Sequence, residues 1–110
     1  MHDTLREEIY QLHAEVCQAL SDPKRILLLY ELQHGPRNVG DLAESLALSQ
    51  PMVSRHLKVL RDRGMVRAER EGTSVFYSVT DARILKALDL LRGVLTTGLQ
   101  ERGALVEEIA

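Results

Sequence analysis

Residues 48–60, LSQPMVSRHLKVL, decide the fold of this chain. Ser49 suits the N-cap of a helix, and Pro51 suits its first turn, where the missing N–H of proline costs nothing. At 100° per residue one side of this helix is apolar, and it is formed by Val53, Leu57 and Leu60. The opposite side is a polar stripe of Gln50, Ser54, Lys58 and Arg61, with Arg55 beside it. The pattern predicts an amphipathic helix that is anchored by its apolar side and projects the polar stripe outward.

A short helix is predicted before this one, and a hairpin after it. Asn38 can cap the short helix, and residues 47–49 then form a tight connection. Two helices joined in this way form a helix-turn-helix, here at about residues 39–63. Strand-forming apolar residues lie on both sides of a turn at residues 71–74 (EGTS). We expect this hairpin, at about residues 65–79, to be a wing.

Two further helices are predicted ahead of the helix-turn-helix. Thr4 and Glu7 have the spacing of a capping box, and apolar residues then recur on one helical face. The first helix is therefore expected over about residues 4–20. Ser21 or Asp22 can cap the second helix, which has proline in its first turn.

A last helix is predicted after the hairpin. Thr80 can cap it, and its apolar residues continue through three glycines to about residue 109. A length of 110 residues gives room for one compact domain. We therefore expect residues 1–110 to form a single winged helix-turn-helix domain, mainly α with a small β-hairpin, in the order four helices, two strands and one helix.

The basic charge of the chain is concentrated around the predicted helix-turn-helix. The formal net charge is −2, yet residues 49–70 contain six basic and two acidic residues, so this segment carries +4 and the remainder −6. Such asymmetry lets one face of a protein meet a polyanion although the average charge is negative.

The polar stripe has the chemistry to read a DNA major groove. Arg and Lys can donate to guanine, Gln can pair with adenine, and Ser can bond bases or phosphates. The expected DNA-binding side chains on the helix are Gln50, Ser54, Arg55, His56, Lys58 and Arg61, and those on the hairpin are Arg67, Arg70, Thr73 and Ser74. The hairpin residues should add phosphate or minor-groove contacts, and solvent exposure alone is the alternative for each. For His56, DNA contact and a bond at the boundary between helix and core are equally open.

Four segments carry a resemblance to a known family. They are residues 19–25 (ALSDPKR), 48–60, 64–66 (GMV) and 70–72 (REG), and they resemble the ArsR/SmtB family of bacterial and archaeal repressors. The resemblance implies a homodimer whose first and last helices, at about residues 4–20 and 81–109, form the interface. It also implies double-stranded DNA with an inverted repeat as the partner, with half-sites about 34 Å apart. The large apolar surface of these two helices agrees with such a dimer.

The metal-ligand positions of that family are mostly empty in this chain. Where the family's arsenic and cadmium sensors have a Cys-x-Cys pair, the resemblance places Asn38 and Gly40. In the zinc-type site Asp81 alone matches, and the other positions are occupied by Arg83, Val94 and Thr97. A guanidinium would repel a cation, so neither a metal nor another cofactor is expected.

Cys17 and His13 lie four residues apart and share a face of the first helix. Three interpretations of Cys17 are open: a small buried or half-buried residue, a thiol that senses oxidants or electrophiles, or a metal ligand together with His13. A single cysteine cannot form an intramolecular disulfide, as in a reducing compartment. No apolar run approaches the roughly 20 residues of a membrane span, and residues 1–10 are too polar for a signal peptide. We expect a cytoplasmic protein without a membrane partner.

These observations favour a DNA-binding transcriptional repressor that is released by an effector which the sequence does not identify. No nucleophile triad, phosphate loop or paired-carboxylate cleft is recognisable, so the chain is not expected to be an enzyme. Two alternatives are a winged-helix module that binds another protein and a regulator that responds through Cys17. The first would have no need of the polar stripe.

Overall fold

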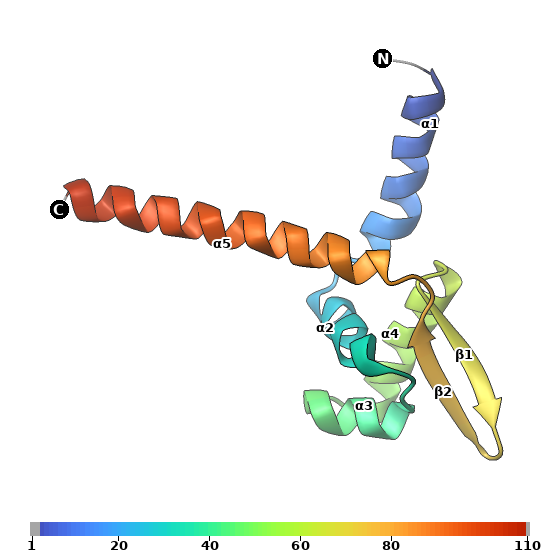
Figure 1. The fold of residues 1–110 in the computed structure, drawn as a ribbon. Coiled ribbons are helices and arrows are strands. Elements are labelled where there is room, and N and C mark those ends of the chain that lie inside the picture. Colours follow the sequence, from blue (N-terminus) through green and yellow to red (C-terminus); the bar gives the residue numbers. More distant parts are fainter. Residues whose placement is uncertain (1–2, 110) are drawn as a thin grey trace.

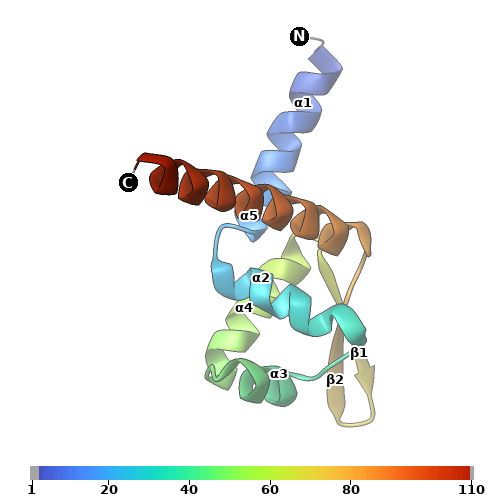
Figure 2. The ribbon, with the colours of Figure 1, turned by 60° about the vertical axis from the view of Figure 1, so that its left-hand side comes forward.

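The structure is a computed structural model that describes residues 3–109, with the side chains of residues 3–103. Its elements are α1 (Asp3–Leu12), the π-helical turn η1 (His13–Cys17), α2 (Pro23–Glu31), the 3₁₀ turn η2 (Leu32–His34), α3 (Val39–Leu46), α4 (Gln50–Asp62), β1 (Val66–Glu71), β2 (Ser74–Val79) and α5 (Arg83–Ile109). The predicted mainly helical winged helix-turn-helix, with its element order, is confirmed. α1 and α5 extend away from the body formed by α2, α3, α4 and the hairpin (Figures 1 and 2).

The body is closed around one apolar core to which α2, α3 and α4 contribute most. Its fully buried larger side chains are Leu28, Leu29, Leu42, Val53, Leu57 and Leu60. α5 adds Leu85 and Leu88 near its start, whereas α1 has no buried residue. The projecting parts of both terminal helices are therefore held by little of this chain's own core.

The capping residues of the helix-turn-helix are those predicted. The Asn38 side chain accepts a hydrogen bond from the Asp41 N–H at 2.8 Å, and Ser49 accepts one from the Met52 N–H at 3.3 Å. Between α3 and α4, Ala47 adopts the left-handed conformation with φ 54°. These caps set where each helix starts, and the left-handed residue turns the chain between them.

At the other helix ends, one predicted cap is wrong and one of two candidates is selected. Thr80 does not cap α5; its hydroxyl donates to the Gly64 carbonyl at 2.7 Å, and Asp81 instead accepts from the N–H of Arg83 at 2.9 Å. Of the two candidates for α2, Asp22 is the cap, since it accepts from the Lys24 N–H at 2.9 Å.

The N-terminal helix is also not a regular α-helix throughout. After α1 it widens into the π-turn η1 before it ends, a feature that apolar periodicity does not reveal. We call residues 3–19, which include α1 and η1, the N-terminal helix.

The wing is a two-stranded antiparallel sheet. β1 and β2 pair from Val66 with Val79 to Glu71 with Ser74, so the hairpin turn lies within the predicted segment. Arg37, ahead of α3, adds an isolated bridge to Tyr77 of β2, with N···O distances of 3.0 and 2.8 Å. This bridge attaches the wing to the start of the helix-turn-helix.

Candidate nucleic-acid interface

α4 presents two chemically different sides. Its apolar side is fully buried, as Val53, Leu57 and Leu60 are each 0% exposed. The whole polar stripe and Arg55 are exposed. The amphipathic orientation predicted from sequence is therefore confirmed, and the stripe is accessible to a partner of the protein.

A groove of about 400 Å³ lies between α4 and β2, and it is lined by Ser54, Lys58, Arg61, Asp62 and Tyr77. Two cationic side chains and two hydroxyls suit the phosphate oxygens of a nucleic-acid backbone. The Lys58 ammonium forms an ion pair with the carboxylate of Asp62 at 2.9 Å in the free chain. The groove thus has its own acidic group next to one of its cations.

Tyr77 was not among the residues singled out from sequence. Its position follows from the pairing of β2 with β1 and with Arg37, which brings this strand beside α4. Strand periodicity predicts that β2 exists, but it cannot tell which helix the strand will face.

The hairpin residues expected to contact DNA have different surroundings. Arg67, Arg70 and Thr73 are exposed, and Ser74 is half-buried. Arg67 lies 4.0 Å from Glu69 on the same strand, a contact too long and too exposed to hold its side chain strongly. The wing therefore carries two accessible guanidinium groups. The hairpin itself lies beside the helix-turn-helix (Figure 1).

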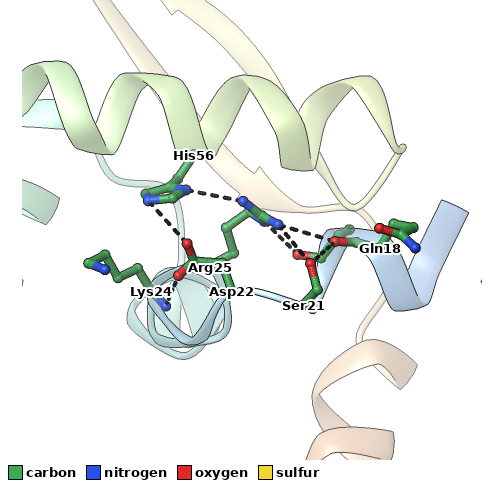
Figure 3. Close-up of polar contacts among 7 residues, drawn as sticks. Gln18, Ser21, Asp22, Lys24, Arg25 and His56 are labelled. Carbon is green, nitrogen blue, oxygen red and sulfur yellow. Dashed lines mark hydrogen bonds and ion pairs between the residues drawn. The ribbon is translucent and has the colours of Figure 1, made fainter.

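His56 lies apart from the polar stripe. Its side chain is 15% exposed, and the ring points to α2, where Nδ1 is 3.3 Å from Arg25 and Nε2 is 3.9 Å from the Asp22 carboxylate (Figure 3). Burial lowers the pKa of His56, and the neighbouring cations lower it further, while Asp22 opposes them. The hydrogen bond from the Lys24 N–H lowers the pKa of Asp22.

Cys17 and His13 both lie in η1, and both are exposed in the single chain. Burial of Cys17 would therefore require a second chain. Within the described residues, no three His, Cys, Asp or Glu side chains gather closely enough to hold a metal ion. Asp81 is occupied by the guanidinium of Arg83, whose hydrogen bonds lower the pKa of Asp81 to about 2.

The fold and the exposed stripe on α4 define a winged helix-turn-helix protein of the DNA-binding class. The family model for bacterial regulatory proteins of the arsR family matches residues 22–68. The regulator Rv0081 of Mycobacterium tuberculosis is 36% identical over 104 residues, which cover 94% of this chain and 91% of that protein. The chain belongs to the arsR family, and it is a DNA-binding transcription regulator.

Solved structures agree with this assignment. The crystal structure of Rv0081 matches with a TM-score of 0.76 and 36% identity over 86% of this chain and 95% of that one. A solution structure of Mb0332 from Mycobacterium bovis, described as a homodimeric winged helix-turn-helix DNA-binding domain, matches with a TM-score of 0.77 and 27% identity, covering 92% and 93%. NmtR of M. tuberculosis is 42% identical over 76 residues, which are 69% of this chain and 63% of that regulator.

No helix among residues 3–109 is both long enough and apolar enough to cross a bilayer.

Proposed function

We propose that this regulator is a cytoplasmic repressor that binds an inverted-repeat operator as a homodimer and leaves it when an effector binds. The observation that carries the proposal is the orientation of α4, which is anchored by three fully buried side chains and exposes the whole polar stripe. Such a helix can enter a major groove without unfolding any of the core.

The positions of the side chains determine which part of the DNA each would contact. We assign base contacts to the exposed residues in the first half of α4, namely Gln50, Ser54 and Arg55. Lys58 and Arg61 line the groove beside the wing and would take phosphates there. Arg67, Arg70, Thr73 and Ser74 of the wing would add flanking contacts, which strengthen binding more than they specify sequence.

The dimer is supported by the apolar surface of the two terminal helices. Up to residue 103, the exposed large apolar side chains of α1 and α5 are Leu5, Ile9, Tyr10, Leu12, Leu90, Leu91, Val94, Leu95 and Leu99. Many large apolar side chains exposed on two projecting helices favour an interface over a surface that stays in contact with water. Mb0332, which has a similar fold, is described as homodimeric. Twofold symmetry would present two α4 helices to the two halves of an inverted repeat.

The experiment is a titration of the purified protein against DNA from upstream of its own gene and against the same DNA with scrambled sequence. Arg55→Ala should weaken binding to the specific site by about 1–3 kcal/mol, whereas Lys58→Ala should mainly lower the salt slope by about 1. Arg6→Ala, which removes an exposed guanidinium from α1, is the charge control. Equal affinity for specific and scrambled DNA at moderate salt would reject the proposal.

A further inference from the structure

Arg25 of α2 connects the end of the N-terminal helix to α4. Its Nε donates to the Ala19 carbonyl at 2.7 Å, and its Nη2 donates to the Gln18 carbonyl at 3.1 Å and to the Ser21 hydroxyl at 3.3 Å. Its Nη1 lies 3.3 Å from Nδ1 of His56 (Figure 3). The Arg25 guanidinium therefore uses all three of its nitrogens to connect α2 with both the N-terminal helix and α4.

The contacts of His56 determine which ring nitrogen carries its hydrogen. A guanidinium can only donate, so Nδ1 accepts and the hydrogen of the neutral ring lies on Nε2. Nε2 faces the Asp22 carboxylate, which is itself held by the Lys24 N–H at the start of α2. The ring is thus oriented from both sides by α2, at the middle of α4.

Arg63, directly after α4, makes a second connection to the N-terminal helix. Its Nη1 donates to the Ala14 carbonyl at 2.7 Å and lies 3.4 Å from the Glu15 carboxylate. Ala14 and Glu15 both belong to the π-turn η1. A carbonyl oxygen has two lone pairs, so it can accept a bond from outside its own helix. π-turns of this kind are frequent at functional sites.

His56 and Arg63, through which both connections are made, lie on the side of α4 opposite the polar stripe. At 100° per residue His56 and Arg63 lie about 200° and 180° around the helix from Ser54. Although Arg63 belongs to the basic segment, its guanidinium is therefore turned to the N-terminal helix and not to the groove.

We propose that Arg25, His56 and Arg63 are positioning residues that fix α4 to the last turns of the N-terminal helix. The orientation of the DNA-reading helix then depends on the position of a helix that the proposed dimer places at its subunit interface. This inference rests on the proposed function, and it adds residues that touch no DNA but determine how well α4 fits it. Displacement of the N-terminal helix would therefore shift both the middle of α4, through Arg25 and His56, and its end, through Arg63.

The test compares Arg25→Met and Arg63→Met with Arg6→Met, which removes the same charge from an exposed position of α1. All three variants are compared at a protein concentration at which each is dimeric, because Arg6 lies next to Ile9 and Tyr10 of the proposed interface. Affinity for specific and for scrambled DNA is measured at several salt concentrations, at a temperature where each variant is folded. We expect each of the two positioning variants to lose about 5- to 30-fold in affinity for the specific site, and less for scrambled DNA. The salt slope should stay unchanged, because no phosphate contact is lost.

Lysine variants separate hydrogen-bond geometry from charge. Both contacts of Arg63 use one nitrogen, so Arg63→Lys should restore most of the affinity. Arg25 uses three nitrogens on different partners, so Arg25→Lys should behave like Arg25→Met. A purely electrostatic role would be rescued by lysine at both positions.

A second measurement does not depend on DNA. The Leu20 N–H donates to the Val16 carbonyl at 3.1 Å near the end of the N-terminal helix, and its hydrogen exchange should be faster in both methionine variants. A wild-type protein that fails to bind DNA would reject the proposed function, and the exchange rates would still decide whether the connections hold. Unchanged specific affinity, a salt slope that falls by about 0.9 in Arg63→Met, or unchanged exchange would each overturn the inference.

Discussion

The Lys58 ammonium lies 2.9 Å from the carboxylate of Asp62, one turn further along α4. Both side chains are largely exposed and line the groove between α4 and β2. A phosphate that enters this groove must therefore compete with Asp62 for Lys58 and must also approach the negative charge of Asp62 itself.

Asp62→Asn should accordingly strengthen DNA binding. The gain should be about 2- to 5-fold at low salt, because an exposed ion pair is worth at most about 1 kcal/mol, and it should shrink as salt increases. Titrations at two salt concentrations measure it, with Glu8→Gln on α1 as the control for the change in net charge. Weaker binding by Asp62→Asn would mean that the ion pair orders Lys58 for DNA and does not compete with it.

The two sides of α4 should respond differently to truncation. Leu57 is fully buried, so Leu57→Ala should lower the free energy of unfolding by about 2–5 kcal/mol. Ser54→Ala on the exposed side should change it by less than about 0.5 kcal/mol. Chemical unfolding at one fixed protein concentration measures both, because the stability of a dimer depends on concentration. A small loss for Leu57→Ala would contradict the anchored orientation of α4.

The buried imidazole of His56 should make stability depend on pH. Burial lowers the pKa of His56 in the folded chain, Arg25, Lys24 and Arg55 lower it further, and Asp22 partly opposes them. As pH falls through about 6.5, the unfolded chain takes up a proton that the folded chain accepts only at lower pH. The free energy of unfolding should therefore decrease on acidification below about pH 6.5 and gain nothing from this group above it.

Urea unfolding at pH 8, 6.5 and 5 measures this dependence, and His56→Gln should flatten it. The lowered pKa of Asp22 acts in a separate window, below its ordinary value of 3.8, where protonation of that carboxyl costs further stability. The same slope in wild type and His56→Gln would assign the effect to other groups.

The sequence predicts those features of the structure that depend on residues close together along the chain. α3, α4 and their caps Asn38 and Ser49 agree with expectation, because a cap and the helix it starts are neighbours along the chain. The outward direction of the polar stripe was equally predictable, since helical periodicity alone separates it from the apolar side.

The remaining features depend on residues far apart in the chain. Thr80 bonds to Gly64, 16 positions earlier, and so leaves the capping of α5 to Asp81. Arg63 turns to Ala14 across 49 positions, so its place in a basic segment did not reveal its partner. His56 remained ambiguous in the sequence for the same reason. Packing of α4 on α2 and on the N-terminal helix determines the contacts of Arg63 and His56. Pairing of β1 with β2 brings Thr80 back to Gly64.

The turn of the helix-turn-helix contains a backbone conformation that its residue does not favour. Ala47 has φ 54° and ψ 43°, where a Cβ atom is strained and glycine is not. Ala47→Gly removes this strain from the folded chain, but it also gives the unfolded chain more conformational freedom. Because the first effect should be larger, the free energy of unfolding should rise by about 0.5–1 kcal/mol. Thermal and urea unfolding measure it. A loss of stability would show that the methyl group makes contacts worth more than the strain.

α5 has large apolar side chains that are exposed in the single chain. Leu91 is 63% exposed in the single chain, and Leu95, one turn further on, is 60% exposed. If a second copy covers them, Leu91→Glu places a charge in an apolar interface twice, once for each subunit. The dimer dissociation constant should then rise by at least about 100-fold, since burial of each leucine is worth roughly 1.5–3 kcal/mol.

Analytical ultracentrifugation over a range of protein concentrations measures that constant. Gln100→Glu is the matched control, because it adds the same charge about 180° around α5 from Leu91, at an exposed position. Specific DNA affinity should fall together with the dimer in Leu91→Glu, since a lone subunit reaches only one half-site. A Leu91→Glu protein that stays dimeric would place the interface elsewhere, and one that is monomeric yet binds the operator as tightly as wild type would rule out recognition by a dimer.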